Sequence, residues 1–152
     1  MDIVNMWING CKILLNKSNP SPYSIYVVPR LVCKDGFSMS VQASPTHYSE
    51  PNGSTYTDFK LNDSNVIHTH FEIGFPNESE SIILKYAEDI DKPTDTVYAR
   101  VPLNRILKAI KKHGGLDNDR LIDEWNTFKG LPHIDTKDVF NTLEDVIMSN
   151  NI

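Results

Sequence analysis

The sequence predicts an α+β fold, in which an antiparallel β-sheet domain (residues 1–101) is followed by C-terminal helices (102–152) in a single compact unit. One observation is the strict alternation over 38–44, Ser-Met-Ser-Val-Gln-Ala-Ser, which is typical of a strand with one buried face. Another is the change of hydrophobic period from two to 3.6 residues after Pro102. Strands first and helices last disfavour a doubly wound parallel sheet.

Two turn signals place hairpins in the sheet. Asn9-Gly10 and Asp35-Gly36 are flanked by β-type residues, and both pairs supply the positive φ angles of a type I′ turn. We therefore expect strands on both sides of each turn, and a long loop over 44–65. The expected strands cover residues 3–8, 11–15, 23–28, 31–34, 37–44, 66–73, 82–86 and 96–101.

Three amphipathic helices follow in the prediction. The first covers 103–113, begins at Pro102 and ends at Gly114. Asp117 or Asn118 caps the second and Asp135 caps the third. The last two carry more large apolar residues than a small sheet can cover, so we expect a homo-oligomer. The residues expected to form that interface are Trp125, Phe128, Phe140 and Leu143.

Composition excludes several classes of protein. The 152 residues carry a net charge of −5, which argues against a general nucleic-acid binder. No apolar run approaches the roughly 20 residues needed to cross a bilayer, and the N-terminus does not resemble a secretory signal. Cys11 and Cys33 are expected to be buried, reduced thiols. We expect a cytoplasmic protein with no membrane, nucleic-acid or cofactor partner.

The polar face of the 38–44 strand is the main candidate for binding. It presents hydroxyls and an amide without charge, which suits a hydrogen-bonding ligand such as a nucleotide or sugar; an ordinary solvent-exposed face is the alternative. Arginine suits phosphate groups and aromatic rings can stack on a base. Arg100 could instead pair with the acidic residues at 88–91. The predicted ligand-binding residues are Gln42, Ser44, His47, Phe75, Tyr98, Arg100 and Arg105.

Two other clusters contain side chains that could bind a metal ion or take part in catalysis. His68, His70 and Glu72 alternate along a predicted strand and, with His47 or His133, could ligate a metal. Their outer members would lie roughly 13 Å apart, too far to share one ion without bending. Glu88, Asp89 and Asp91 could serve acid–base chemistry or hold magnesium, or form a solvated turn. No serine lies in a nucleophile elbow, and no phosphate-binding glycine loop is present.

Several segments of the sequence resemble small bacteriophage and prophage proteins. They are residues 34–44, 47–51, 71–76, 86–89, 93–98 and 111–115. Together they are most similar to the phage anti-Thoeris sponge family, over about residues 23–115, and depart from it at the 52–65 insert. The resemblance implies an antiparallel sheet followed by helices that stabilise a dimer. It also implies a non-enzymatic protein that sequesters a cyclic ADP-ribose isomer, or another cyclic nucleotide, in the host cytoplasm.

Two rival functions remain open at this point. The first is a protein–protein inhibitor of a bacterial defence nuclease, of the anti-CRISPR kind, which mimics nucleic acid with its acidic surface. The net charge of −5 and the acidic residues at 88–91 favour it. The second is a metal-dependent enzyme that uses His68, His70 and Glu72.

Overall fold

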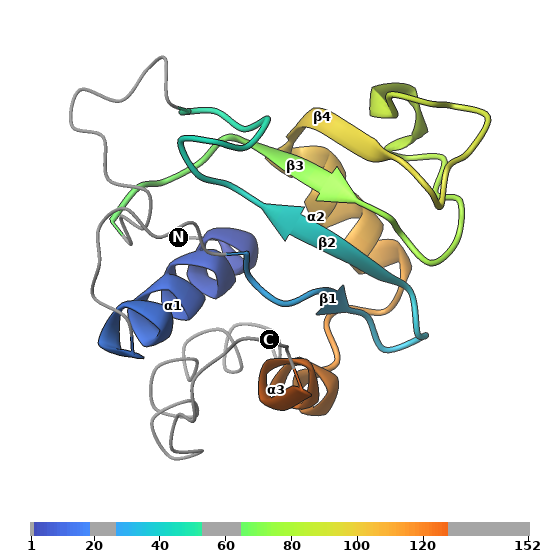
Figure 1. Cartoon of the computed structure of the whole chain (residues 1–152). Coiled ribbons are helices and arrows are strands. Elements are labelled where there is room, and N and C mark those ends of the chain that lie inside the picture. The colour runs from blue at the N-terminus through green and yellow to red at the C-terminus, as the bar shows by residue number, and fades with distance from the viewer. Residues whose placement is uncertain (1, 19–26, 53–64, 128–152) are drawn as a thin grey trace.

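The computed structural model describes residues 2–18, 27–52 and 65–127 (Figure 1). It has a four-stranded antiparallel sheet followed by helices, which confirms the predicted α+β class. Among the described residues, none of the helices has the length and apolar character needed to cross a membrane. The elements are α1 (Ile3–Ser18), β1 (Leu31–Val32), β2 (Ser38–Gln42), β3 (His70–Gly74), η1 (Leu84–Tyr86), β4 (Val97–Pro102), α2 (Leu103–Lys112) and α3 (Asn118–Thr127).

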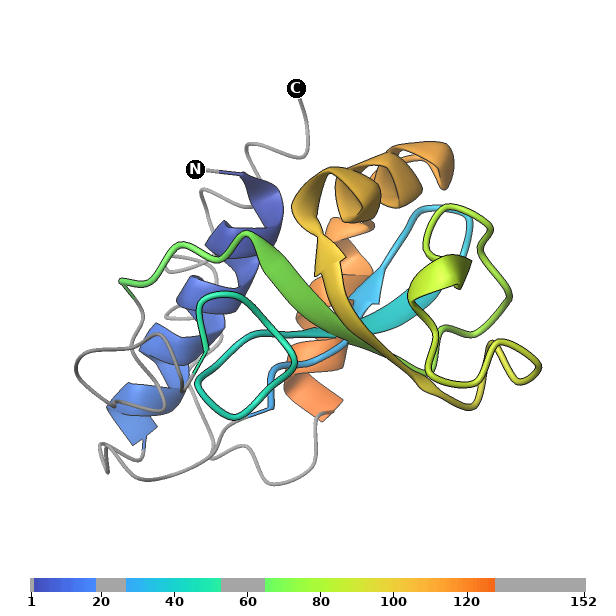
Figure 2. The ribbon, with the colours of Figure 1, turned by 90° about the horizontal axis from the view of Figure 1, so that it is seen from above.

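The sheet has the strand order β1-β2-β3-β4, and its two faces differ sharply. One face carries the buried side chains of Met39, Val41, Ile73 and Tyr98, and α2 covers it (Figures 1 and 2). The opposite face carries Ser40, Gln42, Glu72 and the bare backbone of Gly74. We call this second face the open face, because none of the described helices lies over it (Figure 2).

The first element is a helix, so the predicted hairpin at Asn9-Gly10 is wrong. The buried apolar residues of α1 recur with helical period, which outweighs the turn preference of one Asn-Gly pair. Asp2 also caps the helix, since its Oδ1 accepts a hydrogen bond from Asn5 N at 2.9 Å. The apolar stripe consists of Val4, Trp7, Ile8, Cys11, Leu14 and Leu15.

A second, polar stripe on α1 is buried too. The Nδ2 groups of Asn5 and Asn9 donate to the backbone oxygens of His68 (3.0 Å) and Val66 (3.1 Å). One helical turn further on, Lys12 Nζ donates to Ala43 O at 2.7 Å. The helix is therefore attached to the segments leading into β3 and out of β2 by side-chain to backbone hydrogen bonds.

The other predicted elements have mixed outcomes. The Asp35-Gly36 hairpin is confirmed, with Cys33 N donating to Phe37 O at 2.8 Å and Gly36 at φ 95°. The predicted strand at 82–86 is wrong, because residues 84–86 form a 3₁₀ helix. Residues 27–30 are not in a strand, and the predicted 66–73 strand begins only at His70. Residues 19–26 and 128–152, which include the third predicted helix, lie outside the described residues.

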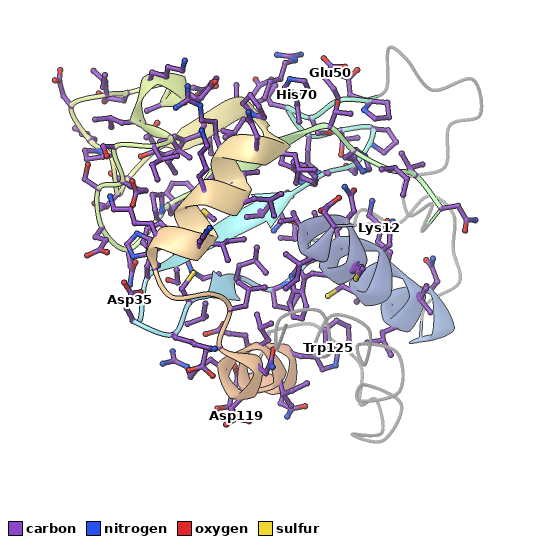
Figure 3. All side chains as sticks on the ribbon, turned by 180° about the vertical axis from the view of Figure 1, so that it is seen from behind. Lys12, Asp35, Glu50, His70, Asp119 and Trp125 are labelled. Carbon is purple, nitrogen blue, oxygen red and sulfur yellow. The ribbon has the colours of Figure 1, made fainter. Side chains whose placement is uncertain are left out.

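The two helices after Pro102 agree with the sequence. Helix α2 ends where Gly114 takes φ 90°, and Asp117 Oδ1 caps α3 by accepting from Arg120 N at 3.1 Å. Trp125, labelled in Figure 3, is only 3% exposed within the single chain. Trp125 therefore belongs to the core of one molecule, and its burial removes one of the reasons to expect an oligomer.

A polar cluster fixes the end of α2. His113, the residue that ends α2, places Nδ1 2.6 Å from Oδ2 of Asp35 and stacks on Phe37 with ring centroids 4.1 Å apart. Its other nitrogen contacts Glu80, which also binds Lys112 Nζ at 3.0 Å. The cluster thus joins the β1–β2 turn, the segment before η1 and the end of α2.

Candidate functional site

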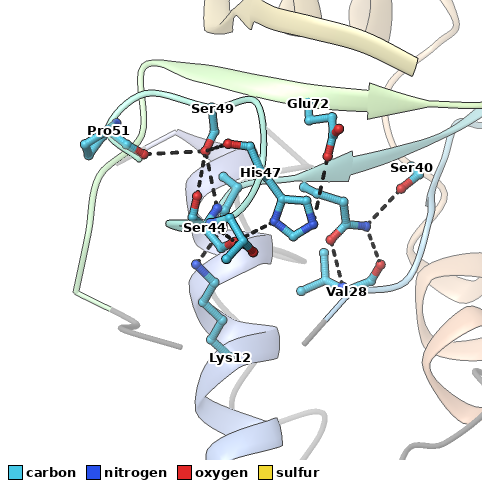
Figure 4. Close-up of polar contacts among 11 residues, drawn as sticks. Lys12, Val28, Ser40, Ser44, His47, Ser49, Pro51 and Glu72 are labelled. Carbon is cyan, nitrogen blue, oxygen red and sulfur yellow. Dashed lines mark hydrogen bonds and ion pairs between the residues drawn. The ribbon is translucent and has the colours of Figure 1, made fainter. Parts of the chain in front are cut away.

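The strand register brings several predicted residues together on the open face. Gln42 of β2 pairs with Glu72 of β3, and Glu72 lies opposite the β-bulge of β4 that contains Ala99 and Arg100. His47, in the loop after β2, reaches the same place, with Nε2 3.9 Å from Oε2 of Glu72 (Figure 4). Glu72 is thus the centre of a row that runs from β2 to β4.

Gln42 has a structural role in this row. Its Oε1 accepts from Val28 N at 2.9 Å, and its Nε2 donates to Val28 O at 2.8 Å and to Ser40 Oγ at 2.9 Å. Both amide protons are used, and the side chain is 6% exposed. Gln42 therefore holds residue 28 against the sheet and has little capacity left for a ligand.

Ser44 positions His47. Its Oγ lies 2.6 Å from Nδ1 of His47 and accepts from Thr46 N at 3.2 Å (Figure 4). The carboxylate of Glu72 on the other side of the ring favours the tautomer with the proton on Nε2. In that tautomer the Ser44 hydroxyl donates to Nδ1, and the Nε2–H of His47 points toward Glu72.

Burial and a nearby cation favour the neutral form of His47. Burial, and secondly the nearby Lys12 ammonium, lower the pKa of His47. Burial, and secondly the charge of Glu88, raise the pKa of Glu72. Neither Nε2 of His47 nor the carboxylate of Glu72 has a hydrogen-bond partner within 3.5 Å among the described residues. This pair therefore has hydrogen-bonding capacity left for a ligand.

Arg100 lies at the β4 end of the row in a strained backbone conformation. Its φ is 49°, and its N donates to Tyr48 O at 3.0 Å. Its Nε donates to Oε1 of Glu50 at 3.1 Å, while its guanidinium carbon lies 5.8 Å from the centre of the Tyr48 ring. The side chain is 49% exposed, and its terminal nitrogens have no partner among the described residues. Arg100 pairs with Glu50 and not with the acidic residues at 88–91.

The remaining predicted residues lie apart from this row. Tyr98 is on the buried face, with its hydroxyl donating to Pro93 O at 2.6 Å, so its ring is not available for stacking. Phe75 is exposed at the far end of β3 and has φ 46°; Arg30 Nη2 donates to its carbonyl at 2.7 Å. Arg105 belongs to α2, on the helix-covered side of the sheet.

The two alternative clusters do not form in this structure. Within the described ranges, no group of three or more His, Cys, Asp or Glu could hold a metal ion. His68 is buried beside Phe71. His70 lies near Glu50 (Figure 3), and its Nδ1 is 2.9 Å from Thr69 Oγ1. His133 lies outside the described residues. The acidic residues at 88–91 form an exposed turn, in which Asp89 Oδ1 accepts from Asp91 N at 3.1 Å.

We define the candidate site as Ser40, His47, Tyr48, Glu72 and Arg100 on and beside the open face. The sequence pointed to His47 and Arg100 as ligand-binding residues, but it did not assign Tyr48 or Glu72 to the ligand. His70 and Glu72 are two residues apart on a strand, and this spacing was the signal that places both side chains on the same face of β3. The position of Tyr48 depends on a bulge and a loop that no local pattern reveals.

Comparison with known proteins finds no matching family, no similar curated protein and no similar solved structure.

Proposed function

We propose that this protein binds a small cyclic nucleotide, of the cyclic ADP-ribose class or a related cyclic nucleotide signal, and sequesters it without converting it. The observation that carries the proposal is Arg100. An exposed guanidinium with unpartnered terminal nitrogens is held in a left-handed backbone conformation within a β-bulge. Strained backbone and bulges cluster at functional sites, and the phage sponge resemblance supports the same function.

The neighbouring groups suggest how such a ligand is held. Arg100 offers its terminal N–H groups to a phosphate, as a guanidinium does most effectively. Tyr48, 48% exposed beside it, offers a ring on which a base can stack. Glu50, Glu72 and Glu88 surround this region, so an anionic ligand needs the positive charge of the exposed Arg100 guanidinium.

The state of Ser44 supports binding without turnover. Ser44 is the hydroxyl that contacts the His47 ring, but it is 3% exposed and bonded to both Thr46 and His47. A catalytic serine has to reach a substrate carbonyl or phosphorus atom, and this one is buried beneath its own turn.

The test uses the full chain, purified from cells that make such signals. Heating the protein and analysing the released small molecules by mass spectrometry should yield an intact cyclic nucleotide. In calorimetry with cyclic ADP-ribose isomers and cyclic dinucleotides, Arg100→Ala should weaken binding about ten- to a hundredfold. The matched control is Arg120→Ala, which removes the same charge from α3. Arg105→Ala tests the remaining predicted arginine.

Two results would contradict the proposal. One is an unmodified protein that binds none of these nucleotides, and the other is an Arg100→Ala variant with unchanged affinity. Chemical conversion of the ligand during incubation would instead indicate an enzyme.

One observation favours the alternative function, an inhibitor of a defence nuclease. Ile90 is 57% exposed at the tip of the acidic turn, and hydrogen bonds to Asp89 and Thr96 order that turn. An apolar tip surrounded by carboxylates suits a basic protein surface. If that function holds, Ile90→Asp should abolish binding to the nuclease, and no nucleotide should be released on heating.

A further inference from the structure

The gap between His47 and Glu72 has the dimensions of a hydroxyl site. Nε2 of His47 and Oε2 of Glu72 lie 3.9 Å apart, which is too far for a direct hydrogen bond. For a hydroxyl oxygen about 2.9 Å from Nε2 and about 2.8 Å from Oε2, the angle Nε2–O–Oε2 would be about 90°. That angle lets one hydroxyl accept from the imidazole while it donates to the carboxylate.

The carboxylate of Glu72 favours one assignment of donor and acceptor roles around the His47 ring, and the bond from Thr46 N to Ser44 Oγ is compatible with it. Thr46 N donates to Ser44 Oγ, the Ser44 hydroxyl donates to Nδ1, and the Nε2–H of His47 therefore points outward. Glu72 supplies acceptor oxygens on the other side of the gap. A group that fills it must both accept and donate, which a hydroxyl does and a phosphate oxygen or an ammonium does not.

We infer that His47 and Glu72 form a notch that binds the ribose hydroxyls of the ligand, with one hydroxyl between the two side chains and its neighbour on the second oxygen of Glu72. A carboxylate that accepts from ribose hydroxyls is a recurrent device in nucleotide-binding sites. The inference rests on the proposed function for its ligand. It adds that the site selects ribose over deoxyribose.

Exposure and position agree with this role. The side chains of His47 and Glu72 are 13% and 18% exposed, so the notch is partly desolvated and still reachable from the open face. Gly74, two residues along β3, carries no side chain, and a Cβ there would lie 3.6 Å from Cβ of Ser40. Arg100 lies across the sheet from Glu72, so a phosphate on Arg100 and a ribose in the notch are compatible with one ligand.

The first experiment compares cyclic ADP-ribose with its 2′-deoxy and 3′-deoxy analogues by calorimetry. The unmodified protein should bind the ribose form about ten- to a hundredfold more tightly. Glu72→Gln keeps the shape but removes the carboxylate, and it should bring this ratio close to one. Asp119→Asn, an exposed carboxylate on α3, is the matched control and should leave the ratio unchanged. Equal affinity for ribose and deoxyribose forms, or an unchanged ratio in Glu72→Gln, overturns the inference.

The second experiment separates the notch from the nucleotide. Free D-ribose and 2-deoxy-D-ribose are titrated into ¹⁵N-labelled protein while the ring nitrogens of His47 are observed by NMR. Ribose should shift the Nε2 signal, and deoxyribose should shift it much less. A ribose-specific shift in a protein that binds no nucleotide would support the notch and contradict the proposed function. No response to ribose would overturn the notch, even if nucleotides bind elsewhere.

Discussion

Nε2 of His113 lies 2.7 Å from Oε1 of Glu80, a carboxylate whose side chain is 1% exposed. Because Nδ1 of the same ring lies 2.6 Å from Asp35, both ring nitrogens face carboxylate oxygens. Ionised carboxylates can only accept, so both nitrogens must carry protons and His113 is an imidazolium ion. Burial alone would lower the pKa of His113, but the bonds to Asp35 and Glu80 outweigh it and raise the pKa.

The protein should therefore lose stability as the pH rises. The pKa of His113 is higher in the folded than in the unfolded chain, so its contribution is complete below the unfolded value, about 6.5, and disappears as the pH passes the folded value. Urea unfolding between pH 5.5 and 9.5 measures this. We expect His113→Gln to cost about 1.5–3 kcal/mol at the acid end and progressively less at the alkaline end. A difference that stays constant with pH would show that His113 is neutral.

Replacing the partner carboxylate should be costly at neutral pH. Burial raises the pKa of Glu80, but hydrogen bonds from Ile82 N, Lys112 and His113 outweigh burial and leave the pKa below 4.5. Glu80→Gln removes the buried carboxylate between His113 Nε2 and Lys112 Nζ, although Asp35 still contacts His113 Nδ1, so we expect a loss of about 3 kcal/mol at pH 7. This contribution exists above the unfolded pKa and is lost as the pH falls through the folded one, so the difference should shrink as the solution is made more acidic than the unfolded value. The matched control, Glu78→Gln, changes a carboxylate 3.8 Å from His113 that is itself exposed, and should cost much less.

Gln42 should affect stability more than Ser40 does. Gln42→Ala leaves Val28 N and Val28 O, both buried, without their partners, and we expect a loss of about 2 kcal/mol in chemical denaturation. Ser40→Ala removes only one acceptor of the Gln42 amide and should cost well under half as much. Equal losses in the two variants would mean that the amide bridge to Val28 contributes little.

A side chain at Gly36 should destabilise the protein. Its φ is 95°, and a Cβ added there would meet nothing within 4 Å, so any penalty is conformational and not steric. We expect Gly36→Ala to cost about 1–2 kcal/mol, and Gly36→Asn less, because Asn adopts left-handed conformations more readily. The two midpoints in a thermal scan measure the difference. Identical midpoints would indicate that the turn relaxes into another type.

The sequence predicted those elements in which local preference and tertiary packing agree. The Asp35-Gly36 turn, β2 and α2 each combine a turn or cap signal with the matching hydrophobic period, and all three are present. At Asn9-Gly10 the two signals conflict. The apolar residues of α1 have helical spacing, and their burial against the core outweighs the preference of two residues for a turn.

The candidate site was only partly predictable for a similar reason. Alternation shows which side chains of one strand share a face, so Gln42 was grouped with Ser44 and Glu72 with His70. The register, which alternation does not reveal, brings Gln42 and Glu72 together. Alternation does not show whether a polar group is already hydrogen-bonded, and the side-chain amide of Gln42 is bonded to the backbone of Val28. Tyr98 was misplaced because the β4 bulge changes the alternation between Tyr98 and Arg100, so their side chains do not share a face.

Both outer strands of the sheet are occupied by other parts of the same chain. Leu116 bridges to Cys33 beside β1, and Ala87 bridges to Tyr98 on β4. An exposed strand edge is the usual template on which a second molecule adds a strand, in ordered dimers and in aggregates alike. A second copy that added a strand at either position would have to displace the bridge there. Within the described residues, these bridges therefore oppose growth by continuous sheet formation at the positions where they pair.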